Sequence, residues 1–117
     1  MISTFEFSGH IVGIMINSDI DDKVLKEIHT EILAKLEENK TINLFIEIEK
    51  GHDISLTTLL KDIIFKLDHA KQFTKIAMVT ELKWLATIMS MKDLLMKADV
   101  RSFDIKNRME AMNWISE

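Results

Sequence analysis

The stretch Ile-Asn-Leu-Phe-Ile-Glu-Ile at residues 42–48 decides the fold of this chain. Large aliphatic side chains alternate in it with Asn43, Phe45 and Glu47, which is the two-residue period of a β-strand. The alternation predicts one face buried under helices and a second face, with Asn43, Phe45 and Glu47, at least partly exposed to water. A sheet covered on both faces would make this strand apolar throughout, so we expect the helices mainly on one face.

Strand and helix patterns alternate on both sides of this segment. Further strands are predicted at residues 2–7, 10–16, 75–79 and 99–103. Helices are predicted at about residues 21–38, 55–67, 81–96 and 107–115. A turn at residues 8–10 joins the first two strands as an antiparallel hairpin, and helical crossovers make the remaining strands parallel. The sequence therefore predicts an α/β fold with a five-stranded mixed sheet in sequential strand order.

Length and composition restrict the classes of function. The 117 residues suit one domain, residues 1–117, with 47% hydrophobic and 29% charged residues. The sequence has no Cys, no signal-peptide pattern and no apolar run near the ~20 residues that span a bilayer, so we expect a cytoplasmic protein. Its formal net charge is −4 and its basic residues are scattered, which argues against nucleic-acid binding and against broad attraction to anionic lipids.

Two further segments carry a family resemblance. Residues 75–84 read Lys-Ile-Ala-Met-Val-Thr-Glu-Leu-Lys-Trp, and residues 108–115 read Arg-Met-Glu-Ala-Met-Asn-Trp-Ile. Both resemble strings of the SpoIIAA-like branch of the STAS-type fold, and the order of elements agrees over essentially the whole chain. The resemblance implies a right-handed β-α superhelix with helices on one face, shared with anti-sigma-factor antagonists and CRAL-TRIO lipid carriers. No enzymatic activity follows from it.

Ser55 stands where anti-sigma-factor antagonists carry a phosphorylatable serine, in an Asp-Ser-Ser-Gly-like turn before the second helix. Here the turn reads Asp53-Ile54-Ser55-Leu56, so Asp53 and Ser55 match and the glycine is missing. One interpretation is a phosphorylation switch for a regulatory protein partner, because a phosphate is favoured at a helix N-terminus. The other is that Ser55 only caps the helix.

Acidic residues should gather at the edge of the sheet where the parallel strands end. They are Asp19, Asp21, Asp22, Glu49, Asp53, Glu81 and Asp104, with His52 beside them. This acidic rim could bind a divalent cation, or its members could be helix caps and solvated loop residues. No metal-binding motif, nucleophile elbow or glycine-rich phosphate loop is present, so we expect no cofactor, no catalytic residue and no enzymatic activity.

The second and third helices carry more apolar residues than one core face can use. We expect the core to take the stripe Leu56, Leu59, Leu60, Ile63, Ile64 and Leu67. Phe65 lies opposite that stripe, and Trp84, Met91 and Leu94 extend the third helix beyond its core face. These four are the candidate interface residues of a non-catalytic module that binds an apolar small molecule, a lipid or a membrane surface, and that forms a homodimer. The alternative is a wide core in which the eight Met residues fill gaps.

Overall fold

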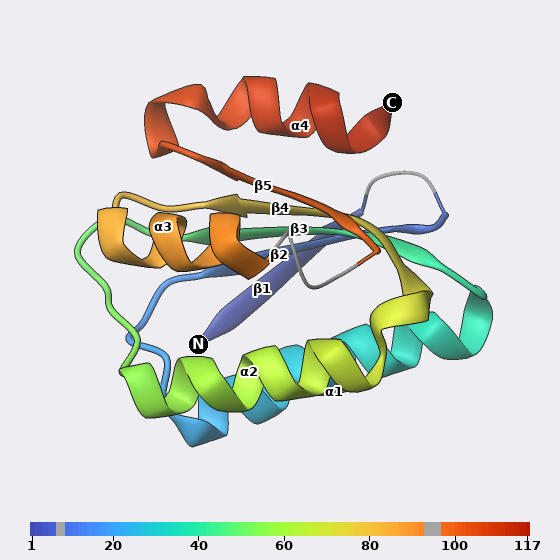
Figure 1. Ribbon diagram of the computed structural model, residues 1–117, viewed down its shortest axis with the longest axis horizontal. Helices are drawn as coiled ribbons and strands as arrows, with labels where there is room; N and C mark the ends of the chain where they lie inside the picture. The colour runs from blue at the N-terminus through green and yellow to red at the C-terminus, as the bar shows by residue number, and fades with distance from the viewer. Residues whose placement is uncertain (7–8, 93–96) are drawn as a thin grey trace.

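Five strands form one sheet in the order in which they occur in the sequence (Figure 1). The computed structural model describes residues 1–6, 9–92 and 97–117. The strands are β1 (Ile2–Glu6), β2 (Ile11–Ile16), β3 (Ile42–Ile48), β4 (Phe73–Val79) and β5 (Asp99–Phe103). The helices are α1 (Asp22–Glu38), α2 (Leu56–Asp68), α3 (Lys83–Lys92) and α4 (Arg108–Ser116), with 3₁₀ turns at Ala70–Gln72 and Ile105–Asn107. The predicted order of elements is confirmed.

The pairing of the strands also follows the prediction. β1 runs antiparallel to β2, and the remaining strands pair in parallel. At the hairpin, Gly13 lies between Phe5 of β1 and Phe45 of β3. A Cβ atom at Gly13 would lie 2.7 Å from the Phe5 ring. Because glycine leaves that space free, Phe5 reaches across β2 and contacts Phe45 edge to face, with 5.5 Å between the ring centroids.

The main core lies between the sheet and helices α1, α2 and α3. The aliphatic face of β3 is fully inside it, as predicted: Ile42, Leu44, Ile46 and Ile48 are all buried. Their partners in this core include Ile28 and Ile32 of α1, Leu59 of α2, and Leu85 and Met89 of α3. Figure 1 shows α1 and α2 side by side on this side of the sheet.

The prediction of a wet second face on β3 is wrong. Asn43, Phe45 and Glu47 are buried, because helix α4 returns across that face of the sheet (Figure 1). Ala111, Trp114 and Ile115 of α4 form a second, smaller core there with Phe45 and its neighbours on the sheet. Helices α1, α2 and α3 lie on one face of the sheet and α4 lies on the other, so the predicted placement of the helices mainly on one face is confirmed. Asn43 and Glu47 of β3 have polar partners on α4. The alternation of residues along the strand does not show that a helix with such partners covers this face.

Hydrogen bonds from charged and polar groups hold α4 on the sheet. The Arg108 guanidinium donates from Nε and Nη2 to the two carboxylate oxygens of Glu47, whose side chain is 1% exposed. These hydrogen bonds raise the pKa of Arg108 above its ordinary value. Asn43 Nδ2 donates to the backbone carbonyl of Ile115 over 3.0 Å. The Arg101 guanidinium lies 4.7 Å from the centroid of the Trp114 ring, a cation–π contact at the same helix.

Substitution Arg108→Ala should destabilise the protein, because it leaves the Glu47 carboxylate buried without its cation. We expect a loss of about 3 kcal/mol in the free energy of unfolding, the lower end for breaking a buried ion pair, since the guanidinium is 42% exposed. Urea denaturation measures it. Adding Glu47→Gln should restore part of the loss by removing the unpaired charge; a double variant less stable than Arg108→Ala would contradict this role of the pair.

Candidate functional site

Helix α2 turns much of its apolar surface to solvent. Leu56, Leu60, Ile64 and Leu67 are 56%, 50%, 59% and 39% exposed. The helix buries Thr58, Leu59, Asp62 and Lys66 instead. The prediction that all six residues of the stripe face the core is therefore wrong for those four, while Leu59 is buried and Ile63 is partly buried against the core.

The two ends of α2 fix this orientation. Ile54, the second residue before the helix, is buried and forms a parallel bridge with Ile20. Ser55 Oγ then accepts a hydrogen bond from the backbone N–H of Thr58 at 3.1 Å, which starts the helix. On the side toward α1, Phe65 stacks on His29 with 3.7 Å between ring centroids. These contacts fix the rotation of α2 about its axis. As a result, its apolar row faces solvent: Leu56, Leu60, Ile64 and Leu67.

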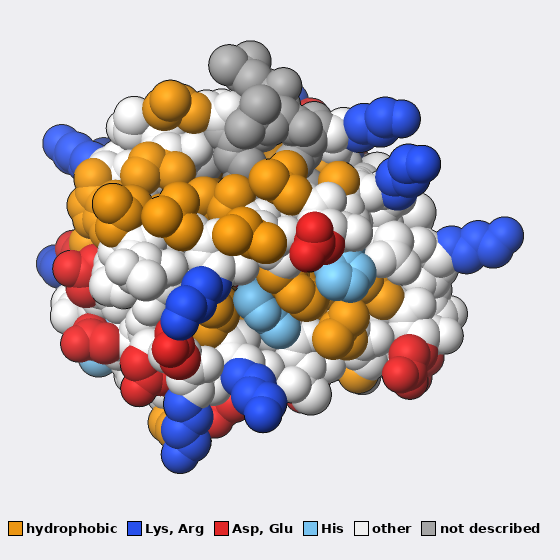
Figure 2. Space-filling view, turned by 60° about the horizontal axis from the view of Figure 1, so that its bottom comes forward, with side chains coloured by type: hydrophobic (Ala, Val, Ile, Leu, Met, Phe, Trp, Pro, Cys, Tyr) orange, Lys and Arg blue, Asp and Glu red, His pale blue; other side chains and the backbone are white. Residues whose placement is uncertain are grey.

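Figure 2 shows a band of hydrophobic side chains on the side of the molecule that carries α2 and α3. On α3, Trp84 and Met91 are 38% and 63% exposed, in keeping with their place as candidate interface residues. We define the exposed apolar surface as Leu56, Leu60, Ile64, Leu67, Trp84 and Met91. Phe65, predicted to belong to it, is partly buried between His29 and His69, so packing within the domain does explain it. Leu94 lies outside the described residues.

Beneath α2 lies a cluster of charged groups within the main core. Asp62 Oδ2 accepts a hydrogen bond from Lys66 Nζ at 2.8 Å, and Asp62 Oδ1 lies 2.9 Å from His29 Nε2. The side chain of Lys66 is 0% exposed and that of Asp62 8%. Sequence reasoning missed this cluster, although Asp62 and Lys66 stand one helical turn apart and so can share a face.

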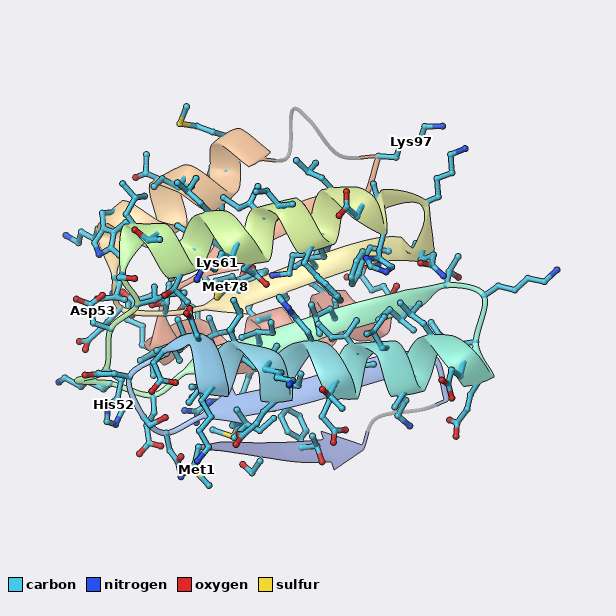
Figure 3. The ribbon with its side chains drawn as sticks, turned by 90° about the horizontal axis from the view of Figure 1, so that it is seen from below. Met1, His52, Asp53, Lys61, Met78 and Lys97 are labelled. Carbon is cyan, nitrogen blue, oxygen red and sulfur yellow. The ribbon has the colours of Figure 1, made fainter. Side chains whose placement is uncertain are left out.

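The cluster borders a void of about 20 Å³ in the core, which is room for about one water molecule. Apart from Asp62 and Lys66, its walls are aliphatic or thioether side chains. They come from the β2 and β3 strands, the three helices of the main core and their connections, together with Met78 of β4, which lies between the ribbons of α1 and α2 in Figure 3. On the outer side, a groove of about 620 Å³ runs between α1 and α2, lined in part by Leu33, Ile64 and Phe65. The Lys66–Asp62 pair thus faces an apolar interior directly beneath an apolar outer surface.

Three residues of the acidic rim, Asp19, Asp21 and Glu81, serve as caps and turn contacts. Asp21 Oδ1 accepts from the N–H of Val24 at 2.9 Å, and Asp19 Oδ1 accepts from the N–H of Asp53 at 3.0 Å. Glu81 Oε2 accepts from the N–H of Gly51 at 2.6 Å, where the backbone has a positive φ of 91°. His52 and Asp53 lie at this end of the molecule in Figure 3. Among residues 1–6, 9–92 and 97–117, no three His, Asp or Glu side chains, Glu49 included, are grouped as metal ligands.

Ser55 lines an open cleft of about 680 Å³ at this rim, together with Asp19, Asp21, Asp22 and Asp53. Its hydroxyl already accepts from the N–H of Thr58 and donates to Thr58 Oγ1 at 2.9 Å. A phosphate on Ser55 would gain the helix N-terminus and would also stand among like charges. The geometry is that of a helix cap, and the predicted phosphorylation stays a prediction.

Breaking the Asp62–Lys66 pair from its two sides should have unequal effects on stability. Asp62→Ala leaves the buried Lys66 ammonium without a counter-charge and should lower the free energy of unfolding by about 3–5 kcal/mol. Lys66→Met keeps the contact of Asp62 with His29, so its loss should be smaller, and the double variant Asp62→Ala with Lys66→Met, which removes both charges, should lie close to the wild type. Urea denaturation compares them, and a larger loss in Lys66→Met than in Asp62→Ala would contradict this account.

None of the described helices combines the length and apolar content that crossing a membrane requires.

No protein with a curated description matches the sequence. An uncharacterized protein of the DUF3478 family from Shewanella loihica PV-4, described as having a SpoIIAA-like fold, is similar in structure, with a TM-score of 0.72. The sequences are 14% identical, and the alignment covers 98% of this chain and 92% of that one. The sequence profile of the SpoIIAA-like family matches residues 11–116, nearly the full length. This chain therefore belongs to the SpoIIAA-like family.

Proposed function

We propose that this protein is a non-catalytic module that binds a lipid or a similar apolar ligand between helix α2 and the sheet, and that meets a membrane surface through the exposed apolar surface. The observation that carries the proposal is the orientation of α2. The helix buries two charged side chains and a threonine and exposes four large aliphatic ones. A helix with that distribution has more apolar area to gain from a new partner than it uses in the folded domain.

The attachment of α2 is weak by comparison with that of α1. Its buried residues include one large apolar side chain, Leu59, whereas α1 buries Val24, Leu25, Ile28 and Ile32. Full burial of one large aliphatic side chain is worth about 1.5–3 kcal/mol. Covering the four exposed residues of α2 with lipid would therefore offset the loss of the Leu59 contacts. We infer that α2 can move away from the sheet, which would turn the small void beneath it into a site for an apolar chain.

The charge of the protein favours neutral lipid surfaces. With a formal net charge of −4, the chain has no general attraction to anionic membranes. Binding through the exposed apolar surface would depend on apolar contact instead. Zwitterionic vesicles and neutral apolar molecules are therefore the appropriate probes.

The cluster beneath α2 does not have the arrangement of a nucleophilic triad. In such a triad the histidine stands between a hydroxyl and a carboxylate. Here the carboxylate of Asp62 stands between His29 and Lys66. This order supports a binding role for the cluster rather than a hydrolytic one.

The double variant Leu60→Ser with Ile64→Ser should lose most of the binding to phosphatidylcholine vesicles and should keep the binding of the neutral dye Nile red, whose proposed site lies beneath α2 and not on its outer surface. Each residue that is buried against lipid contributes roughly 1.5 kcal/mol or more, so the affinity should fall about tenfold per residue. Flotation and fluorescence titration measure the two. Met109→Ser is the matched control, because Met109 is 67% exposed on α4, on the opposite side of the sheet. A wild-type protein that binds neither probe contradicts the proposal.

In the absence of a membrane, we propose that the homodimer expected from the sequence forms through the same surface, so that dimer and membrane are alternative partners for it. A two-fold axis beside α2 would place the apolar rows of two copies against each other, and symmetric pairs are the commonest assemblies of soluble chains. Sedimentation velocity should show a dimer for the wild type and a monomer for Ile64→Lys, with Met109→Lys unchanged as the control. A monomeric wild type would contradict the proposed dimer. A dimer that persists in Ile64→Lys would show that its interface lies elsewhere.

A further inference from the structure

The charged groups beneath α2 specify the head group of the ligand, an inference that depends on the proposed function and deepens it. We propose that the ligand is a long-chain carboxylic acid and that the Lys66 ammonium binds its carboxylate while the chain lies between α2 and the sheet. Lys66 stands on α2 with no exposed surface, at the wall of an otherwise apolar void. It is thus a cation at the wall of a small apolar void, which the proposed movement of α2 would widen into a site for an apolar chain.

The hydrogen bonding of Lys66 leaves capacity for a ligand oxygen. An ammonium group has three N–H donors. Within the described part of the chain it has one hydrogen-bond acceptor, Oδ2 of Asp62 at 2.8 Å. The adjoining void admits one oxygen-sized group without any movement of the helix. A carboxylate oxygen in that position would accept a charge-assisted hydrogen bond, which is stronger than a neutral one.

Stability of the fold does not account for this cluster. A buried ion pair can be replaced by apolar side chains of similar volume with no loss of stability, and often with a gain. The neighbours of Lys66 in the void, among them Leu59, Met78 and Leu85, would pack well against an apolar side chain. The fold does not require a lysine and an aspartate at this depth for its stability, which is consistent with a role in binding.

The cluster offers a single ammonium group to a monovalent anion. Before binding, the Lys66 ammonium is paired with the Asp62 carboxylate. When a ligand carboxylate shares the Lys66 ammonium, Asp62 Oδ1 keeps its contact with His29 Nε2 at 2.9 Å. The other charged groups lining the groove beside His29 are Asp22, Lys26, Lys61 and Asp68, of which Asp22 and Lys61 pair with each other at 2.9 Å.

A single ammonium group favours a carboxylate over the other head groups. A phosphate monoester carries close to two negative charges at neutral pH, so one would be left without a partner in the interior. An alcohol or a methyl ester carries no charge and would leave the Asp62–Lys66 pair as it is. The aliphatic walls of the void recognise no polar group beyond the head, which fits an unbranched hydrocarbon chain.

The test compares palmitate with methyl palmitate, which has the same chain and no charge, by displacement of Nile red from the full-length protein. The wild type should bind palmitate roughly tenfold or more tightly than the ester, because a hydrogen bond to a charged group discriminates by about that factor. Lys66→Met should lose this preference and still bind the ester within about threefold of the wild type. Lys61→Met is the matched control, since Lys61 is an exposed lysine on the same helix, and it should keep the preference.

The outcomes separate this inference from the proposed function. Equal binding of acid and ester by the wild type, unchanged in Lys66→Met, overturns the head-group assignment and leaves the apolar site standing. Binding of neither overturns both. Tighter binding of hexadecyl phosphate than of palmitate overturns the choice of a monovalent head. The acid–ester comparison in the wild type needs no variant, so a Lys66→Met protein that failed to fold would not remove the test.

Discussion

Strand β3 is buried on both faces, and the charge of Glu47 on it must be balanced where water does not reach. The nearest cation comes from the far end of the chain, at Arg108. An unpaired carboxylate in this position would cost several kcal/mol, so the sheet cannot reach its stable form until α4 lies across it. The Asn43 and Lys75 side chains then bind backbone carbonyls of α4. The second face of the sheet is thereby closed by these polar contacts as well as by Trp114 and Ile115.

The opposite side of the sheet is closed in a different way. Helix α1 buries a full aliphatic stripe, but α2 is rolled about its axis, so that Leu56, Leu60 and Ile64 remain outside and Lys66 is inside. The same ionic chemistry that fixes α4 thus recurs under α2 with the opposite consequence. The Glu47–Arg108 pair fastens a helix that also has a good apolar face, whereas the Asp62–Lys66 pair takes positions on α2 that apolar residues would otherwise fill. This asymmetry makes α2 the element on which both functional proposals depend.

Similarity in fold carries only part of this argument. At 14% identity, the Shewanella loihica structure supports the architecture and not the chemistry of any site. Family membership likewise places the chain among proteins with this β-α order. The function is argued from the exposed apolar surface and from the cluster of His29, Asp62 and Lys66, which belong to this chain's own sequence.

Local pattern was sufficient to predict the order of the elements, the antiparallel hairpin and the burial of Ile42, Leu44, Ile46 and Ile48. Those features follow from residue periods and from short connections, which are properties of neighbouring residues. Trp84 and Met91 were also placed correctly outside the core, because one helix face cannot contain every apolar residue of α3.

The orientation of α2 and the environment of Glu47 could not be read in that way. Both Leu59 and Ile64 fit the helical period, so the period alone does not show which of them faces the core. A charged residue on a strand is consistent with exposure to solvent and equally with a buried partner of opposite charge. The choice was made by groups distant in sequence: Arg108 for Glu47, and His29 for the face of α2 that carries Asp62. Sequence by itself determined which segments are strands and helices, since that depends on local periodicity. Only the tertiary structure decided which side of each faces inward, since the energy of a buried charge is set by the partner that the fold brings to it.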